Sequence, residues 1–299
     1  MNDQTSAGLT GSLAGSHRGG STDGPTFAVA FGGGGARGLA HIQAIEALDE
    51  LGIRPVAISG SSIGAIMGAA VASGMTGKEI EDYARSILSR RAEIISRMWS
   101  VRPQSLGGMV GGLKVAQFNI ERILHAFLPH HVPNSFEELA IPLQVTGTDY
   151  YGHHATVFSH GDLRGALAAS AAIPAVFAPV VRDGRTYIDG GIYNPVPFDL
   201  LHGKADIVIA VDVVGAPQEV EGRKPTSVDL MFGATQLLMQ SIIANTLHKC
   251  RPDILLRPPV SKYRVLDFLK IDALLAETAG IKDELKRAVD AAVKARDAA

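Results

Sequence analysis

The segment Val56–Ala65, with the sequence VAISGSSIGA, decides the expected fold. It opens with an apolar run typical of a strand, and a run of small and apolar residues typical of a helix begins at Ile63. Between the two runs, Gly60, Ser62 and Gly64 form the pattern Gly-x-Ser-x-Gly. A strand that turns directly into a helix strains the turn residue, and glycines on both sides leave room for the bend. The pattern therefore predicts a nucleophile elbow that presents the Ser62 hydroxyl.

Two neighbouring serines, Ser59 and Ser61, compete with Ser62 for this role. Neither of them has glycine at both flanking positions, so the pattern favours Ser62. Gly-x-Ser-x-Gly also occurs in ordinary loops, and it is the strand before it and the helix after it that favour a functional site. The amino end of a helix favours negative charge, which suits an attacking serine oxygen.

A glycine-rich segment, GGGGARG, occupies residues 32–38. It follows the apolar run 26–31 and precedes a helical pattern over residues 39–51, so the order predicts a βαβ unit in a parallel sheet. A dinucleotide site would need an acidic residue after the second strand, and a phosphate-binding P-loop would need Gly-Lys-Ser or Gly-Lys-Thr. Both are missing here. An oxyanion hole and a purely structural tight turn remain as interpretations.

Composition narrows the functional class. The chain has 299 residues, 46% of them hydrophobic and 19% charged, with a net charge of −2. A near-neutral charge argues against a nucleic-acid partner, and the single Cys250 excludes an internal disulfide. No cluster of histidine, cysteine or acidic residues has metal-ligand spacing, so we expect no metal and no other cofactor. With no secretory signal and no uninterrupted apolar run of roughly 18 residues, we expect a soluble, cytoplasmic protein.

Three consecutive parts are expected. Residues 1–25 are rich in glycine, serine and threonine without periodicity, which predicts a disordered tail. Residues 26–214 carry the strand and helix patterns of an α/β core. Residues 215–299 are predicted to be mainly helical, with a short strand at 254–256, and to pack on the same domain.

An amphipathic stripe with interspersed arginines runs from Ile80 to Trp99, and a glycine-rich break follows at residues 100–114. One interpretation is transient contact of this stripe with an anionic membrane surface, with the break acting as a lid. The commoner alternative is a helix that packs on its own core, followed by an ordinary connection.

A serine nucleophile needs a base, and ten histidines are available without one that stands out by position. Asp189 does stand out. It directly follows two strand patterns joined at Asp183-Gly184, and Gly190 and Gly191 come next. This order places a carboxylate at a sheet edge that the backbone can approach closely. A capping or turn aspartate is the alternative interpretation.

Three motifs taken together, GGGARG at 33–38, GSSIG at 60–64 and DGG at 189–191, resemble the patatin-like phospholipase family, and most closely its short bacterial members. The resemblance covers about residues 26–214 in the family's order. It implies a three-layer α/β fold, with a mostly parallel central sheet between helices, and a Ser–Asp dyad without histidine. In that dyad Ser62 is the nucleophile and Asp189 the base, and the oxyanion hole is formed by the amides of Gly33, Gly34 and Gly35.

Arg37 stands at the family's basic position, where it braces the glycine loop or meets a phosphate. The remaining motif positions are Gly38, Gly60, Gly64, Gly190 and Gly191. The resemblance implies a serine acyl hydrolase of the lipase or phospholipase A type, which cleaves fatty acyl esters of phospholipids or related lipids through an acyl-enzyme. The alternatives are an acyltransferase or a non-lipid esterase using the same site, and a regulatory protein with a vestigial site.

Overall fold

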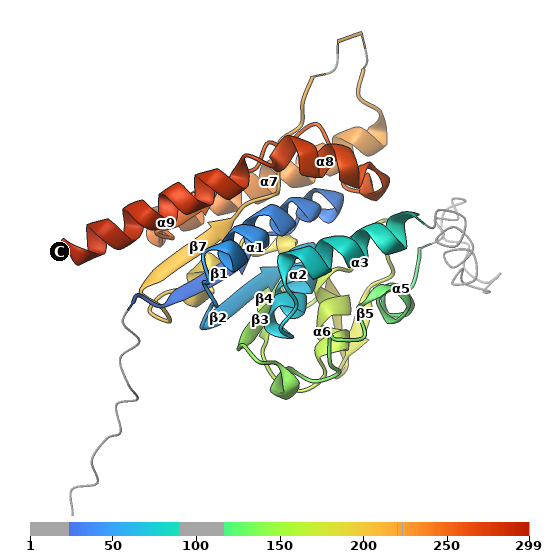
Figure 1. The fold of residues 1–299 in the computed structure, drawn as a ribbon. Helices are drawn as coiled ribbons and strands as arrows, with labels where there is room; N and C mark the ends of the chain where they lie inside the picture. Colours follow the sequence, from blue (N-terminus) through green and yellow to red (C-terminus); the bar gives the residue numbers. More distant parts are fainter. Residues whose placement is uncertain (1–23, 90–116, 220, 223, 299) are drawn as a thin grey trace, which may run out of the picture.

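The structure is a computed structural model that describes residues 24–89, 117–219, 221–222 and 224–298 (Figure 1). The predicted tail lies almost entirely outside these residues. So do the glycine-rich break and the part of the amphipathic stripe beyond Ser89.

The described strands form one eight-stranded sheet in the order β5-β6-β3-β2-β1-β7-β8, and β4 pairs with β3 off this path. Neighbours among β8, β7, β1, β2 and β3 run parallel, whereas β4, β5 and β6 pair in antiparallel fashion. The strands are β1 Phe27–Phe31, β2 Ala57–Ser61, β3 Leu143–Asp149, β4 His154–Phe158, β5 Val180–Arg182, β6 Arg185–Ile188, β7 Ile207–Val211 and β8 Ile254–Leu256.

Helices lie on both faces of this sheet. The α-helices are α1 His41–Glu50, α2 Ile63–Ala72, α3 Gly77–Ser89, α5 Ile120–Phe127, α6 Leu163–Ser170, α7 Ser227–Lys249, α8 Ile271–Thr278 and α9 Ile281–Asp297. The 3-10 helices are η1 Gly35–Ala40, η2 Phe136–Glu138, η3 Gly190–Ile192, η4 Phe198–Leu201 and η5 Phe268–Lys270.

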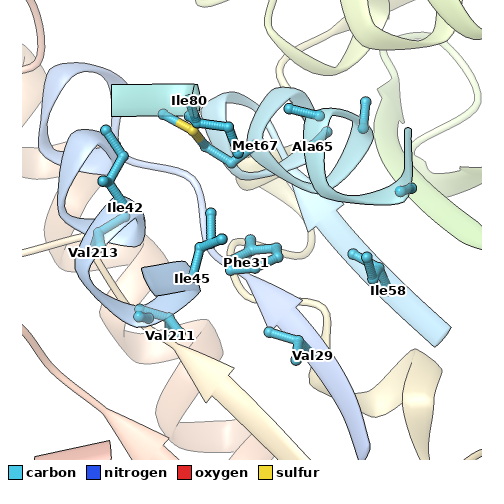
Figure 2. Close-up of a cluster of buried hydrophobic side chains, with 14 of the residues drawn as sticks. Val29, Phe31, Ile42, Ile45, Ile58, Ala65, Met67, Ile80, Val211 and Val213 are labelled. Atoms are coloured by element: carbon cyan, nitrogen blue, oxygen red, sulfur yellow. The ribbon is translucent and has the colours of Figure 1, made fainter. Parts of the chain in front are cut away.

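Alternation along β1 divides the interior into two cores, because successive side chains of a strand point to opposite faces. Val29 and Phe31 belong to the larger core, which they share with α1 and α2, and Figure 2 shows Phe31 within this cluster. Ala28 and Ala30 face the smaller core, which contains residues of η4 and Ile243 of α7. The sheet therefore lies between two helical layers, and the predicted three-layer α/β fold is confirmed.

The first helix begins later than its pattern predicts. Residues 35–40 form the 3-10 helix η1, and α1 starts only at His41. The tighter turn arises where the Nε–H of Arg37 binds the carbonyl of Gly34 and the N–H of Ala36 binds the carbonyl of Val265. The glycine loop is thus tied to a segment far along the chain, which a local pattern does not reveal.

The carboxyl-terminal part adds both a strand and helices to the domain. The predicted short strand is present as β8, which pairs in parallel with β7. Helix α9 runs beside α1 (Figure 1), and Lys282 and Lys286 form ion pairs with Glu46 and Glu50 of α1. These contacts join the end of the chain to the first βαβ unit.

The described part of the amphipathic stripe, in α3, packs on the domain. Ile80 is buried, and Leu88 is packed against the larger core. Arg85 pairs with Glu81 within the helix and with Asp272 of α8. In this segment, therefore, the apolar side covers the protein's own core.

Helix α7 is largely apolar but contains no uninterrupted apolar run of membrane-spanning length. Polar residues interrupt it, but among the described helices it is the one long and apolar enough to match a membrane-spanning segment. Its Gly233 and Ile243 are nevertheless buried, Ile243 in the smaller core. One side of α7 therefore packs on the sheet.

Candidate active site

Ser62 forms the whole turn between β2, which ends at Ser61, and α2, which begins at Ile63. Its backbone has φ 54° and ψ −126°, an unfavourable conformation for a residue with a side chain. A Cβ added at Gly60 would lie 2.6 Å from the Ala65 nitrogen, and one at Gly64 would lie 2.1 Å from the Phe31 oxygen. Glycine is required at both positions because helix α2 begins directly against the strand backbone. The turn has the geometry of a nucleophile elbow.

The three adjacent serines have different surroundings. The Oγ of Ser59 donates to the carbonyl of Pro197 at 2.8 Å, which uses that hydroxyl structurally. The Oγ of Ser61 is buried without a hydrogen-bond partner in the described part of the chain. The Oγ of Ser62 donates to Oδ2 of Asp189 at 2.6 Å. Of the three, Ser62 alone has a hydrogen bond to a carboxylate that can accept its proton.

Asp189 is held by hydrogen bonds to three segments of the surrounding chain. It follows β6 and caps η3, and its Oδ1 accepts the N–H of Gly191 at 2.8 Å. Its own N–H donates to the carbonyl of Ala172 at 3.0 Å, and its carbonyl accepts the hydroxyl of Thr148 at 2.8 Å. Gly190, the next residue in the sequence, begins η3. These bonds orient the free carboxylate oxygen toward Ser62.

Burial controls the charge of this carboxyl group. Only 7% of Asp189 and 4% of Ser62 are exposed. Removal from water raises the pKa of Asp189 to about 6, although the hydrogen bonds from Ser62 and Gly191 oppose the increase. Near neutral pH the carboxylate is therefore mostly ionised, and its proton affinity is high enough for general-base chemistry.

The glycine loop lies beside the nucleophile because β1 and β2 are parallel neighbours. A Cβ added at Gly33 would lie 3.3 Å from the Cβ of Ser62. The Gly33 N–H, however, already donates to the carbonyl of Pro195 at 2.8 Å. The described residues provide no acceptor for the N–H groups of Gly34 and Gly35. Of the three amides, therefore, that of Gly33 is engaged by the protein itself, and those of Gly34 and Gly35 are not bonded to a described residue.

Arg37 braces the loop. It is buried, and its Nε–H donates to the carbonyl of Gly34 at 3.1 Å. Burial lowers the pKa of Arg37 to about 10, and the charge of Asp212 partly offsets that effect. Gly38 lies against Ile63 at the start of α2. Of the two roles considered for Arg37, contact with the loop is the one visible in this structure.

Two further residues support the site without a clear pattern in the sequence. The Oγ of Ser170, at the end of α6, accepts the N–H of Ser62 at 2.8 Å. The Nε2 of the buried His41 lies 2.8 Å from the carbonyl of Gly32, and burial lowers the pKa of His41 to about 4. Ser170 has no local signal, and His41, three residues after the glycine-rich segment 32–38, is not singled out by any pattern either.

The histidines in the described part of the chain do not converge on Ser62. Among the residues that the structure describes, no histidine is hydrogen-bonded to Ser62 or Asp189. The same residues contain no group of three histidine, cysteine or acidic side chains arranged to hold a metal ion.

Sequence comparison relates this site to known proteins. Residues 29–202 match the family model described as patatin-like phospholipase. An uncharacterised NTE family protein of Mycobacterium bovis is 38% identical over 193 residues, which cover 64% of this chain and 50% of that protein. The mouse patatin-like phospholipase domain-containing protein 6 is 30% identical over 207 residues, or 66% of this chain and 14% of that protein. The chain thus spans half the length of the mycobacterial relative, and much less of the mouse protein.

Solved structures are more distant. VipD from Legionella pneumophila aligns with 86% of this chain and 67% of its own, at 14% identity and a TM-score of 0.39. ExoU of Pseudomonas aeruginosa, solved with SpcU, aligns with 90% of this chain and 52% of its own, also at 14% identity and a TM-score of 0.39. Family assignment rests on the match over residues 29–202, which includes the glycine loop, the elbow and Asp189. The chain therefore belongs to the patatin-like phospholipase family.

Proposed function

We propose that the protein is a serine acyl hydrolase that cleaves fatty acyl esters of phospholipids or related lipids. The observation that carries this proposal is the 2.6 Å hydrogen bond from Ser62 Oγ to Asp189 Oδ2 at a strained strand-to-helix turn. Membership of the patatin-like phospholipase family supports the choice of a lipid ester as substrate.

In the proposed reaction, Asp189 takes the hydroxyl proton as Ser62 Oγ attacks the acyl carbonyl carbon. The resulting oxyanion accepts hydrogen bonds from the N–H groups of Gly34 and Gly35, which Arg37 helps to hold in place. Collapse of the intermediate breaks the ester bond. The leaving alcohol takes the proton from Asp189, and the acyl group remains on Ser62.

Deacylation repeats the same steps with water. Asp189 removes a proton from the attacking water. As the second tetrahedral intermediate collapses to a fatty acid, Asp189 returns that proton to the departing Ser62 Oγ, which restores the hydroxyl and the carboxylate. An alcohol in place of water would yield a new ester, so hydrolase and acyltransferase differ only in the acceptor. Product analysis with added alcohols separates these two activities.

The test compares Ser62→Ala with Ser61→Ala. Ser61 is the matched control because it is the adjacent serine, is buried, and has a hydroxyl with no hydrogen-bond partner in the described chain. Purified proteins are incubated with a panel of phospholipids and neutral lipid esters, and released fatty acids are identified. A fluorophosphonate probe measures reactivity of the serine independently of the substrate.

We expect probe labelling and fatty acid release for the wild type and Ser61→Ala, and neither for Ser62→Ala. Full activity in a folded Ser62→Ala protein would refute the proposal. A wild-type protein that does not react with the probe would instead support a vestigial site.

A further inference from the structure

The outer side of α7 is exposed and apolar. Leu230 and Leu237 are seven positions apart, as are Met231 and Leu238, so these residues lie on one side of the helix, and 66% of Leu238 is accessible. No charged residue occurs between Leu230 and Leu247. A solvent-facing helix side is ordinarily polar, so this side requires an explanation. The exposed large apolar residues are Val228, Leu230, Met231, Leu237 and Leu238.

The inner side of the same helix reaches the candidate active site. A Cβ added at Gly191, whose N–H holds Asp189, would lie 2.9 Å from the Cε of Met239. The side-chain amide of Gln236 donates to the carbonyl of Val214 at 3.0 Å, and so fixes α7 to the chain that follows β7. The exposed leucines therefore lie on an element that contacts the catalytic machinery.

A second segment, residues 262–270, also exposes apolar side chains and also contacts the candidate active site. The carbonyl of Val265 accepts the Ala36 N–H at 2.8 Å, so the segment contacts the glycine loop. Arg264 pairs with Asp229 of α7 at 3.4 Å, which joins the two segments. Leu266 and Leu269 are also exposed. We call the seven exposed apolar residues of α7 and this segment the apolar rim.

Positive charge accompanies the apolar rim. Each cation of residues 262–270 is more exposed than the acid with which it pairs, as shown by Arg264, with 56% of its side chain accessible, and Asp229, with 28%. In each pair, therefore, the cation is the partner more accessible to a binding surface. The cations are Lys262, Arg264 and Lys270, and their acidic partners are Glu277, Asp229 and Asp267.

We propose that the apolar rim docks on the surface of an anionic phospholipid bilayer, with α7 lying in the plane of the interface. The proposal rests on the proposed function, because a buried Ser62 reaches a membrane lipid only where the protein around the site meets the bilayer. Leucines then enter the acyl boundary while the cations meet lipid phosphates. An isologous contact with a second copy of the chain would instead place the exposed cations of both copies in one interface.

Docking is tested on the full chain by flotation with vesicles of phosphatidylcholine alone or mixed with phosphatidylglycerol. The rim variant is Leu230→Gln, Leu237→Gln and Leu238→Gln combined, since glutamine retains helix propensity. A matched control replaces two exposed apolar residues elsewhere, Tyr151→Gln and Val181→Thr. Hydrolysis of a soluble short-chain ester is measured in parallel, because it reports the proposed function without a membrane.

We expect the wild type and the control to float with the mixed vesicles. The rim variant should bind these vesicles at least roughly tenfold more weakly than the wild type. Ester hydrolysis should be equal in all three proteins. Equal flotation of the rim variant, or no flotation of the wild type, overturns the docking proposal. A wild type that does not hydrolyse the ester would instead contradict the proposed function. Failure of docking and failure of the proposed function are therefore distinguishable.

A second variant keeps the test decisive if the first fails to fold. Lys262→Gln with Lys270→Gln leaves α7 intact and should reduce both binding to the mixed vesicles and its dependence on salt. Light scattering after size-exclusion chromatography tests whether a second copy of the chain covers the apolar rim instead. A wild-type dimer that the rim variant dissociates, without vesicle binding, would assign the surface to a second copy and overturn the proposal.

Discussion

The hydroxyl of Ser62 donates a 2.6 Å hydrogen bond to Asp189 although 127 residues separate them. The bond joins the two side chains directly, with no imidazole between them. Strand order explains the meeting, because β6, which precedes Asp189, pairs with the end of β3, and β3 pairs with β2, which precedes Ser62.

Asp189→Asn should lower turnover by a factor on the order of 10² or more, because an amide keeps the shape of the side chain but does not accept the proton. Steady-state hydrolysis and probe labelling of the folded variant measure the loss. Single substitutions of the ten histidines serve as the comparison. A folded histidine variant as inactive as Ser62→Ala, together with an active Asp189→Asn, would contradict the dyad.

Activity of the wild type should fall as the pH decreases through about 6, the pKa to which burial raises Asp189, because the protonated carboxyl group is not a base. Below that value kcat/KM should decrease about tenfold per pH unit. This midpoint lies close to the roughly 6.5 of a free histidine, so a pH profile alone does not separate dyad from triad. Undiminished kcat/KM at pH 4.5 would exclude Asp189 as the base.

The burial of Asp189 should make its ionised carboxylate destabilise the folded state. A pKa raised from 3.8 to about 6 means that the folded state binds the proton more tightly than the unfolded state. Stability contributed by Asp189 is therefore present at low pH and is lost as the pH rises from about 4 to 6. At pH 7.5, Asp189→Asn should increase the free energy of unfolding by an amount on the order of 3 kcal/mol or less. Urea denaturation at several pH values measures this gain, which should shrink toward pH 4.

The contribution of His41 to the stability of the fold should depend on pH in the opposite direction. Burial lowers its pKa from 6.5 to about 4, so the unfolded state binds the proton more tightly. Stability should be lost as the pH falls from about 6.5 to 4. We expect this loss in the Asp189→Asn background, where the opposing contribution of Asp189 is absent. It should be much smaller when His41→Gln is added, because glutamine does not titrate. If urea denaturation gives the same pH dependence for Asp189→Asn with and without His41→Gln, His41 is not the titrating group.

Local patterns were sufficient for much of the fold. The turn at Asp183-Gly184 was predictable, and both residues adopt positive φ, 50° and 73°, between β5 and β6. The strand β1, the short strand β8 and the elbow at Ser62 were also predictable from adjacent residues. In each case, neighbours in the sequence supply the physical constraint, either glycine in a strained turn or a short apolar run typical of a buried strand.

The sequence by itself determined that Ser62 lies on an elbow and that Asp189 follows a strand, since both depend on adjacent residues. Only the tertiary structure decided that Pro195 engages the N–H of Gly33, and that Ser170 binds the N–H of Ser62. It also decided that the apolar outer side of α7 remains uncovered by the described residues. These features depend on strand order and helix placement, which bring distant segments together and which no local pattern encodes.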